Sequence, residues 1–528
     1  MQLSKTFENN QVNMAEIILS PSKLRGQDHD AAIICDDEIV NYSQLWSRVN
    51  QAGNAFLKIN ISIGDRVIIM VRDTPAFFYV YLGLLKIGAI PIAINLRLNP
   101  DDVAYTMNDS KAKAIVLDDV FLSGYRGIAK DISLRPKIIN TDVEHGDLYY
   151  LPKIMGVASH QLDAVKLKPE DPAFWMYSSG TTGRPKGVVH SQKSILAADH
   201  LMGEILGVGP GDRIYGSSKL FFAFSLAHCF LASIRLGATT ILYPEWPDAE
   251  AVANVVQQHK PTIFLSVPTF YRNMLREGVA NKSQFKNVRH YITAGEKLPS
   301  TLFARWVEVT GHPILEGIGA TETCFLFLAN RPDKIISGTC GLPTPETKVK
   351  LIDGSGEVIT KSNTPGILWV KMECVASGYW NMKKRTREVF KDGWYCTNDM
   401  FMFDDLGYYE YQGRIDDILK ISGQWVSPAE IEAEVLKNKA VTEAAIVGVP
   451  NEDGLIRLAL FIVTPKLAVP KEDFEKQLIA SLRANLSIYK CPRSIYYLDE
   501  MPLTATGKLQ RFVLRDKAES SQKAKILE

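Results

Sequence analysis

Short apolar runs alternate with helical stretches along most of the first 400 residues. Residues 66–71 are apolar almost throughout, as expected for a strand that is buried on both faces of a parallel sheet. Residues 75–87 have the length and composition of a helix, and a second apolar run follows at 90–94. The same succession of strand and helix recurs at 262–267, where a predicted strand is followed by Pro268 and a predicted helix. This alternation predicts α/β layers with mostly parallel sheets.

The pattern changes after about residue 337, where short strands alternate with turns such as Asp353-Gly354. We therefore expect a β-rich subdomain, followed from Gly413 by a small unit of mixed α and β structure. Within it, Ser427-Pro428-Ala429-Glu430 predicts a helix start, because Ser suits the cap, Pro the first helical position and Glu the third residue after the cap. The last dozen residues are polar, and we expect them to be frayed.

Length and composition place the chain among multidomain globular proteins. Its 528 residues exceed the roughly 250–300 that one core supports. Hydrophobic residues make up 46% and charged residues 23%, which excludes a disordered, collagen-like or coiled-coil chain. The net charge is +1 at pH 7, and no basic stripe is visible, so we do not expect nucleic acid as the main partner.

The cysteines and the termini indicate the compartment. Seven cysteines are scattered without a C-x-x-C pair, which argues against a zinc site or disulfide framework and suits a reducing environment. The N-terminus lacks the layout of a signal peptide. The longest apolar stretch, residues 77–96, is interrupted by Lys86, Pro91 and Asn95 and falls short of the ~20 clean residues of a membrane span. We predict a cytoplasmic protein that does not enter a membrane.

The stretch from Tyr177 to Gly187, YSSGTTGRPKG, is the most informative segment. Its glycines allow close backbone approach to a ligand, while backbone N–H groups, hydroxyls and Lys186 provide donors for an anion. These features fit a cradle for a polyphosphate. A flexible surface loop is an equally good interpretation of the composition alone.

The order of residues in this loop resembles the signature of the adenylate-forming enzymes, which include acyl-CoA synthetases, adenylation domains and luciferases. Further segments resemble the family's motifs in the family's order: residues 317–322 (GIGATE), 394–399 (WYCTND), 413–420 (GRIDDILK) and 504–508 (TATGK). Within the family, residues 219–224 (KLFFAF) and 317–330 (GIGATETCFLFLAN) are most similar to benzoate-type aryl-CoA ligases.

The resemblance implies a two-step reaction. An aromatic carboxylic acid of the benzoate, aminobenzoate or hydroxybenzoate type attacks the α-phosphorus of ATP, giving an acyl-adenylate and pyrophosphate. The thiol of coenzyme A then displaces AMP. Because a carboxylate is already a nucleophile, the protein has to align the reactants and neutralise charge with Mg²⁺ and cationic side chains.

Roles for single residues follow from the same resemblance. Lys508 is expected to bridge the substrate carboxylate and the α-phosphate in adenylation, and Lys186 and Thr321 to contact phosphates. Glu322 is expected to hold Mg²⁺, which prefers carboxylate oxygens, and its apolar flanks predict burial. The remaining nucleotide-binding residues are expected to be Ser178, Ser179, Gly180, Thr181, Thr182, Gly183, Ala294, Gly295, Glu296, Gly317, Ile318, Gly319, Asp399 and Arg414.

The family also implies two domains that rotate between the half-reactions. We expect an N-terminal domain over residues 1–412, made of layered α/β subdomains and the β-rich subdomain. A hinge at 413–417 with Asp416 as its pivot would lead to a small mobile α+β domain over 418–528. Lys420, Ser422 and Gly423 would face coenzyme A in the second state. Asn398 stands where the family has glycine, and since Asn tolerates left-handed backbone angles, we expect the turn to survive.

The acyl pocket implied by the resemblance is aromatic, as suits a flat acid. Ser225 and His228 differ from the family's usual residues. They could read an amino or hydroxyl group on the ring, or be core residues with satisfied hydrogen bonds. The expected lining is Phe222, Ala223, Phe224, Ser225, His228, Gly319 and Phe325.

Two other functions compete with an aryl-CoA ligase. A stand-alone adenylation enzyme would load the acid onto a carrier protein, which a partner would have to supply because the chain has no carrier-like segment. An inactive nucleotide-binding module is disfavoured, since the charged motif residues are all present. The sequence leaves open whether the chain is a monomer or a homodimer.

Overall fold

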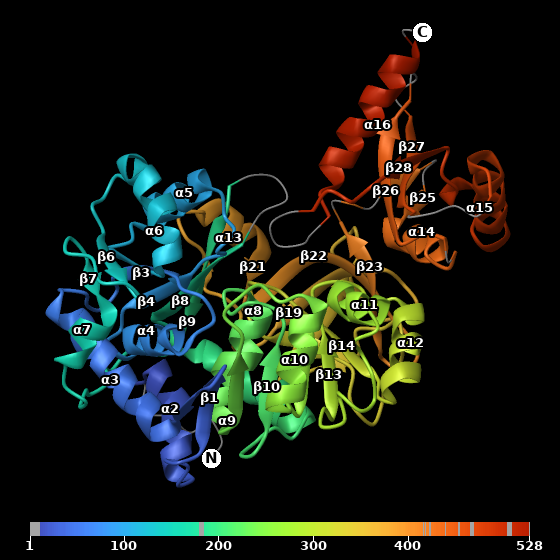
Figure 1. Ribbon diagram of the computed structural model, residues 1–528. Helices are drawn as coiled ribbons and strands as arrows, with labels where there is room; N and C mark the ends of the chain where they lie inside the picture. Colours follow the sequence, from blue (N-terminus) through green and yellow to red (C-terminus); the bar gives the residue numbers. More distant parts are fainter. Residues whose placement is uncertain are drawn as a thin grey trace. The chain divides into compact units, whose positions relative to one another are not determined.

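A computed structural model of the protein describes residues 11–178, 184–415, 417, 419–421, 424–438, 440–451, 455–464, 469–503 and 509–526 (Figure 1). Contacts divide the chain into two compact units. The first comprises residues 1–349 and 369–396, and the second comprises 350–368 and 397–528. The domain boundary at 412 and the hinge at 413–417 stay predictions.

The first unit contains a large, mostly parallel sheet. Among the described residues it has nine strands, with parallel pairing from β14 through β1 and antiparallel strands at both edges. In spatial order the strands are β16 (Leu342–Pro343), β15 (Leu326–Ala329), β14 (Ile314–Gly319), β13 (His290–Thr293), β12 (Ile263–Ser266), β10 (Arg213–Gly216), β11 (Thr239–Leu242), β1 (Ala31–Cys35) and β2 (Glu38–Asn41).

A second sheet of the same unit has eight strands among the described residues. Its order is β20 (Gly378–Tyr379), β9 (Lys186–Ser191), β8 (Pro172–Ser178), β4 (Ile90–Ala93), β3 (Arg66–Met70), β5 (Ala114–Leu117), β6 (Lys137–Asn140) and β7 (Tyr149–Tyr150). Strands β8 through β7 run parallel, and β9 returns antiparallel on β8. The predicted parallel α/β architecture is therefore confirmed.

Helices follow these strands where the sequence predicts them. Helix α4 (Pro75–Lys86) follows β3, and α11 (Pro268–Arg276) follows β12, each with Pro in its first turn. Helix α5 (Pro100–Ser110) begins after Asn99, whose side chain accepts a hydrogen bond from the backbone of Asp102 at 2.8 Å. The aromatic core of the nine-stranded sheet is completed by α10 (Ala249–His259) and α12 (Ser300–Thr310), which bury Val252 and Trp306.

A third sheet forms the predicted β-rich region. Its strands lie in the order β18 (Val358–Ile359), β17 (Lys348–Ile352), β19 (Gly366–Lys371), β22 (Trp394–Phe403) and β21 (Phe390–Lys391). Strand β23 (Tyr409–Arg414) pairs with β22.

The second unit continues with mixed α and β structure. It contains the hairpin of β24 (Leu419–Ile421) and β25 (Gln424–Val426), then helix α14 (Pro428–Val435). Strands β26 (Glu443–Pro450), β27 (Ile456–Val463) and β28 (Ser494–Leu498) form a small sheet. Helices α15 (Lys471–Asn485) and α16 (Arg511–Ile526) pack against this sheet through two apolar clusters.

The predicted helix start is confirmed, because Ser427 is the N-cap residue of α14 and Pro428 is its first residue. The Ser427 side chain makes no capping hydrogen bond, and its hydroxyl donates to the carbonyl of Gln412. The expectation of frayed C-terminal residues is wrong as far as Ile526, where α16 ends. Leu514 and Ala518 lie one helical turn apart and are fully buried in the apolar cluster with β26 and β27, so an apolar stripe holds a helix that is otherwise mostly polar.

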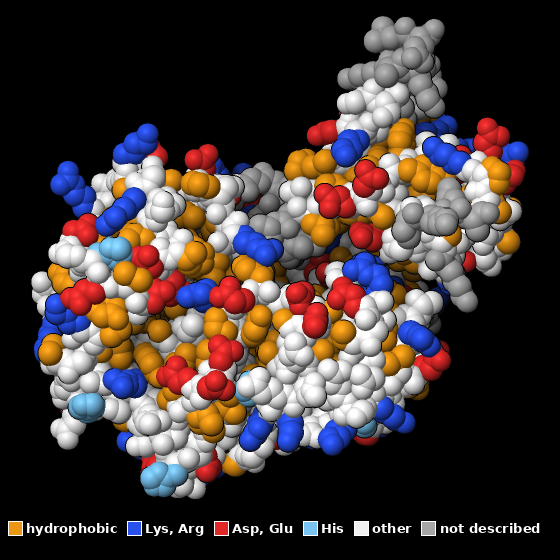
Figure 2. All heavy atoms as spheres, viewed as in Figure 1, with side chains coloured by type: hydrophobic (Ala, Val, Ile, Leu, Met, Phe, Trp, Pro, Cys, Tyr) orange, Lys and Arg blue, Asp and Glu red, His pale blue; other side chains and the backbone are white. Residues whose placement is uncertain are grey.

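The surface and the cysteines complete the description. On the face in Figure 2, acidic and basic side chains are interspersed and do not gather into one patch. All seven cysteines lie among the described residues; they are buried, and no disulfide joins them. None of the helices that the structure describes is long and apolar enough to cross a membrane.

Candidate functional site

The predicted phosphate loop connects β8 to β9. These strands form an antiparallel hairpin in which Ser178 pairs with Lys186, so the connection starts and ends at neighbouring positions. Ser178 and Lys186 are described, whereas Ser179, Gly180, Thr181, Thr182 and Gly183 lie outside the described residues. The hydroxyl of Ser178 is buried and has no hydrogen-bond partner among the described residues, which leaves it available to a ligand at the loop.

Lys186, Glu322 and Tyr379 meet beside this loop. The Nζ atom of Lys186 lies 3.1 Å from Oε1 of Glu322 and 3.0 Å from the Tyr379 hydroxyl. That hydroxyl donates to the same Oε1 at 2.7 Å. The three side chains come from β9, from the turn after β14, and from β20, which pairs with β9. Residues far apart in sequence thus form one polar triad.

The Glu322 carboxylate is buried as predicted, with 6% of the residue exposed. Burial alone would raise its pKa, but Lys186 and the Tyr379 hydroxyl outweigh burial and hold the pKa below its ordinary value. The group is therefore an ionised oxygen donor at neutral pH, which is the chemistry that Mg²⁺ prefers. Among the described residues, no group of three or more His, Cys, Asp or Glu side chains is arranged so that it could hold a metal ion. In charge and atom type, the Glu322 carboxylate fits a single protein ligand for Mg²⁺.

The turn that carries Thr321 and Glu322 is held by the side chain of His190. The Nε2 atom of His190 lies 2.8 Å from the Thr321 carbonyl, and the His190 ring stacks on Phe174. Burial lowers the pKa of His190 to about 4, so the ring is neutral and its N–H donates to that carbonyl. The turn ends at Cys324, whose φ of 60° is unusual for a residue with a side chain.

Two groups of predicted nucleotide-binding residues follow or end neighbouring strands. Ala294, Gly295 and Glu296 follow β13; Ala294 is buried, and Gly295 has a φ of 90°. Gly317, Ile318 and Gly319 end β14. A Cβ atom on Gly319 would lie 2.9 Å from the Phe325 carbonyl, so this position requires glycine. Parallel neighbours β13 and β14 bring both segments to one edge of the sheet.

The predicted acyl residues lie close to this edge. Phe222, Ala223, Phe224 and Ser225 lead into the π-helical turn η4 (Leu226–Ala232), which carries His228. The His228 ring contacts Phe224 and Phe325 edge-on, at centroid distances of 5.7 and 5.6 Å. The two segments that the sequence assigns to the acid therefore meet at His228.

A buried ion pair anchors the start of the acyl segment. Lys219 is 3% exposed; its Nζ atom donates to the carbonyls of Tyr243 and Glu245 after β11 and lies 3.7 Å from Asp73. Asp73 also accepts the backbone N–H of Leu220 at 3.2 Å. The segment is thereby fixed to residues that follow β3 and β11.

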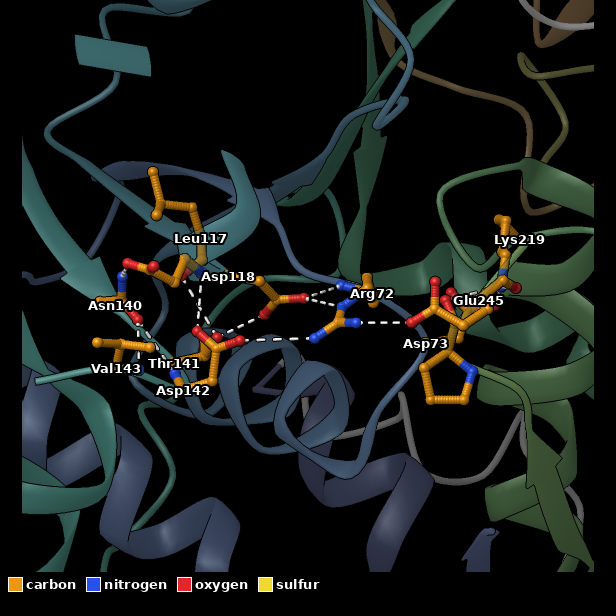
Figure 3. Close-up of polar contacts among 12 residues, drawn as sticks. Arg72, Asp73, Leu117, Asp118, Asn140, Thr141, Asp142, Val143, Lys219 and Glu245 are labelled. Atoms are coloured by element: carbon orange, nitrogen blue, oxygen red, sulfur yellow. Dashed lines mark hydrogen bonds and ion pairs between the residues drawn. The ribbon is translucent and has the colours of Figure 1, made fainter. Parts of the chain in front are cut away.

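Beside this pair, Arg72 joins the carboxyl ends of several strands (Figure 3). Its guanidinium lies 2.9 Å from Asp118 after β5, 3.5 Å from Asp142 after β6, and 2.7 Å from Glu245 after β11. Glu245 follows a strand of the nine-stranded sheet, and the others follow strands of the eight-stranded sheet. Arg72 therefore connects the two sheets at the ends of their strands.

In the second unit, two of the predicted nucleotide-binding residues, Asp399 and Arg414, lie opposite each other in a strand pair. Asp399 on β22 pairs with Arg414 on β23, and their side chains lie 3.4 Å apart. Asn398 has a φ of 57°, so the expectation that asparagine keeps the left-handed turn of the usual glycine is confirmed. Asp416, Ser422, Gly423 and Lys508 lie outside the described residues, as does the side chain of Lys420.

Sequence reasoning missed Tyr379 and His190. Tyr379 is 193 positions from Lys186 in the chain, and no local pattern marks it as a partner. His190 follows the loop motif by a few residues and reads as part of a buried strand. The sequence offered only a weak signal for His190, which lies on β9 directly after the phosphate loop. Tyr379 lies on β20 and comes close to the loop only because β20 pairs with β9.

Comparison with known proteins agrees with this geometry. The pattern of the "AMP-binding enzyme" family matches residues 22–380, and that of the "AMP-binding enzyme C-terminal domain" matches 430–508. The chain belongs to the AMP-binding enzymes. The family membership predicted from the motifs is thus confirmed.

Several AMP-binding enzymes match over nearly the whole chain. A 3-hydroxybenzoate–CoA/4-hydroxybenzoate–CoA ligase of Thauera aromatica is 42% identical over 96% of this chain and 97% of its own. A 3-hydroxybenzoate–CoA ligase of Aromatoleum sp. (strain CIB) is 43% identical, with the same coverage. Among solved structures, the anthranilate CoA ligase AuaEII in complex with anthranoyl-AMP matches with a TM-score of 0.89 and 31% identity, covering 96% of this chain and 98% of that one.

Proposed function

We propose that this AMP-binding enzyme is an aryl-CoA ligase. It activates an aromatic carboxylic acid with ATP to an acyl-adenylate and then forms the thioester with coenzyme A, releasing AMP and pyrophosphate. The observation that carries this function is the Lys186–Glu322–Tyr379 triad beside the phosphate loop, in which Glu322 and Tyr379 are buried. Similarity over 96% of the chain to ligases for hydroxybenzoates supports the aromatic substrate.

In the first step, a carboxylate oxygen of the acid attacks the α-phosphorus of ATP, and the bond to pyrophosphate breaks. We propose that the Lys186 ammonium contacts phosphate oxygens and that Thr321, which precedes Glu322 in the same turn, contacts phosphate as well. Glu322 would hold Mg²⁺, which offsets negative charge on the leaving pyrophosphate when it is bound. The chain needs no general base for this step, because the attacking group is already ionised.

In the second step, the thiol sulfur attacks the acyl carbon, AMP leaves, and the thiol proton goes to solvent. We propose that Lys508 serves adenylation only, that Asp399 and Arg414 bind the ribose, and that Lys420, Ser422 and Gly423 serve the thiol step after rotation about Asp416. Lys508→Ala should then abolish adenylate formation and leave thioester formation from supplied acyl-adenylate largely intact. Equal loss of both half-reactions would refute separate roles.

Among aromatic acids, we favour hydroxybenzoates. The relatives of 42% and 43% identity are both named for them. A stand-alone enzyme that loads a carrier protein remains the second candidate, and the cytoplasmic location and a homodimer stay predictions.

The deciding experiment is ATP–pyrophosphate exchange with benzoate, 3- and 4-hydroxybenzoate, aminobenzoates, cinnamate and short fatty acids, repeated with coenzyme A while AMP is followed. We expect exchange with hydroxybenzoates and CoA-stimulated AMP release. Exchange without CoA stimulation would favour the carrier-protein function, whereas exchange with aliphatic acids alone would refute the aromatic substrate.

A further inference from the structure

His228 is a buried polar side chain without a polar partner. The residue is 1% exposed, and neither Nδ1 nor Nε2 has a hydrogen-bond partner among the residues that the structure describes. A buried donor or acceptor left unpaired is costly to the fold, and most such groups in proteins are satisfied. Two orphaned nitrogens on one ring therefore point to a missing ligand.

The position of His228 indicates which ligand. Its ring makes T-shaped contacts with Phe224 and Phe325, at interplanar angles of 71° and 82°. These phenylalanines belong to the two segments that the sequence assigns to the acid. His228 also lies in a π-helical turn, a local widening of the helix that often marks functional sites.

The protonation state of His228 fixes what it can bind. Burial lowers the pKa of His228 to about 3, so the imidazole is neutral at pH 7. A neutral imidazole has one N–H donor and one bare acceptor nitrogen. It can therefore accept from a phenolic O–H or donate to its oxygen, and it offers no charge that would attract a second carboxylate.

Ser225, the other polar candidate of this pocket, is already engaged. Its hydroxyl donates to the Ser218 carbonyl at 2.7 Å, in a residue that is fully buried. A ring N–H of His228 over a phenylalanine face would be only a weak substitute for a hydrogen bond, and it would leave the second nitrogen unpaired. Of these two polar residues, His228 is the one whose ring nitrogens have no partner among the described residues and are available to a substrate.

We infer that His228 is the specificity residue that distinguishes a hydroxylated aromatic acid from the unsubstituted acid. One ring nitrogen forms a hydrogen bond with the phenolic hydroxyl, while Phe224 and Phe325 contact the aromatic ring. This inference rests on the proposed aryl-CoA ligase function and adds the group that reads the ring substituent.

The test compares the wild type with His228→Phe, His228→Asn and the matched control His200→Phe, which replaces another buried histidine with an unpaired Nδ1, outside the proposed acid site. For each, kcat/KM is measured by AMP release with coenzyme A, using 3-hydroxybenzoate, 4-hydroxybenzoate and benzoate. The readout is the ratio of the preferred hydroxybenzoate to benzoate. Loss of a buried hydrogen bond should lower this ratio about 10- to 100-fold in His228→Phe. His228→Asn, which keeps a donor and an acceptor, should retain part of it, and His200→Phe should keep the wild-type ratio.

Each failure has a distinct signature. A wild type that activates no aromatic acid refutes the proposed function itself. A wild type that prefers hydroxybenzoate, together with a His228→Phe variant that prefers it equally, refutes only the role of His228. If His228→Phe does not fold, His228→Met, which is apolar and flexible, provides the same comparison with the same two outcomes.

Discussion

Replacing Tyr379 by phenylalanine removes one oxygen from the triad and leaves the ring in place. That oxygen donates to Glu322 at 2.7 Å and lies 3.0 Å from the Lys186 ammonium, while the ammonium also lies 4.2 Å from the centre of the Tyr379 ring. The ring contact survives in Tyr379→Phe, so the variant isolates the hydroxyl.

The magnitude follows from the kind of hydrogen bond that is lost. A hydrogen bond to a charged group contributes about 1.5–3 kcal/mol. If Tyr379 orients the Glu322 carboxylate toward its metal ion, kcat/KM for MgATP should fall about 10- to 150-fold, since each 1.4 kcal/mol is a factor of ten. The loss should also shift half-maximal activation to a higher Mg²⁺ concentration, because Glu322 would be held less firmly.

The assay is ATP–pyrophosphate exchange at varied ATP and Mg²⁺, with Tyr215→Phe as the matched control. The Tyr215 hydroxyl is buried and has no hydrogen-bond partner within the described part of the chain, so its removal should leave exchange unchanged. An unchanged rate in Tyr379→Phe would refute the orienting role. A faster rate would show instead that Tyr379 holds Lys186 and Glu322 back from the nucleotide.

Three further predictions concern the scaffold. Lys219→Met leaves Asp73 buried without its cation and should cost about 3–5 kcal/mol in unfolding free energy by denaturant titration; the double variant with Asp73→Asn should lose less than the single one. Burial holds the pKa of His190 near 4 and that of His228 near 3, below the ordinary value of about 6.5. The unfolded chain therefore binds more protons below pH 6.5, and stability should fall as the pH drops from 6.5 toward 4, less steeply in His228→Phe; equal slopes would contradict this. Asn398→Gly should fold as well as the wild type, while Asn398→Val should lose about 1–2 kcal/mol because of its left-handed backbone. Equal melting temperatures for these two variants would exclude that strain.

Features set by local pattern could be predicted from the sequence. Strand β3 and helix α4 follow from an apolar run and a helix-length stretch that begins with proline. The burial of Glu322 followed from its apolar flanks, and the left-handed turn at Asn398 from the backbone preference of asparagine. In each case the deciding residues are neighbours in the chain.

Features set by long-range contact could not be predicted. Tyr379 reaches Glu322 because β20 pairs with β9, and Lys219 finds Asp73 and the carbonyls after β11 only once the sheets have formed. Ser427 occupies a helix cap position, yet its side chain makes no capping hydrogen bond, because its hydroxyl donates to the carbonyl of Gln412. The engagement of Ser225 with Ser218 is likewise a property of packing.

The burial of every cysteine has a consequence for an enzyme that handles a free thiol. Burial raises the pKa of Cys35 and Cys229 to about 12, so only about one molecule in 10⁵ carries either thiolate at pH 7. Thiol–disulfide exchange needs an accessible thiolate. Because all seven cysteines are buried, oxidised coenzyme A finds no exposed protein thiol with which to form a mixed disulfide, although the proposed substrate itself reacts through sulfur.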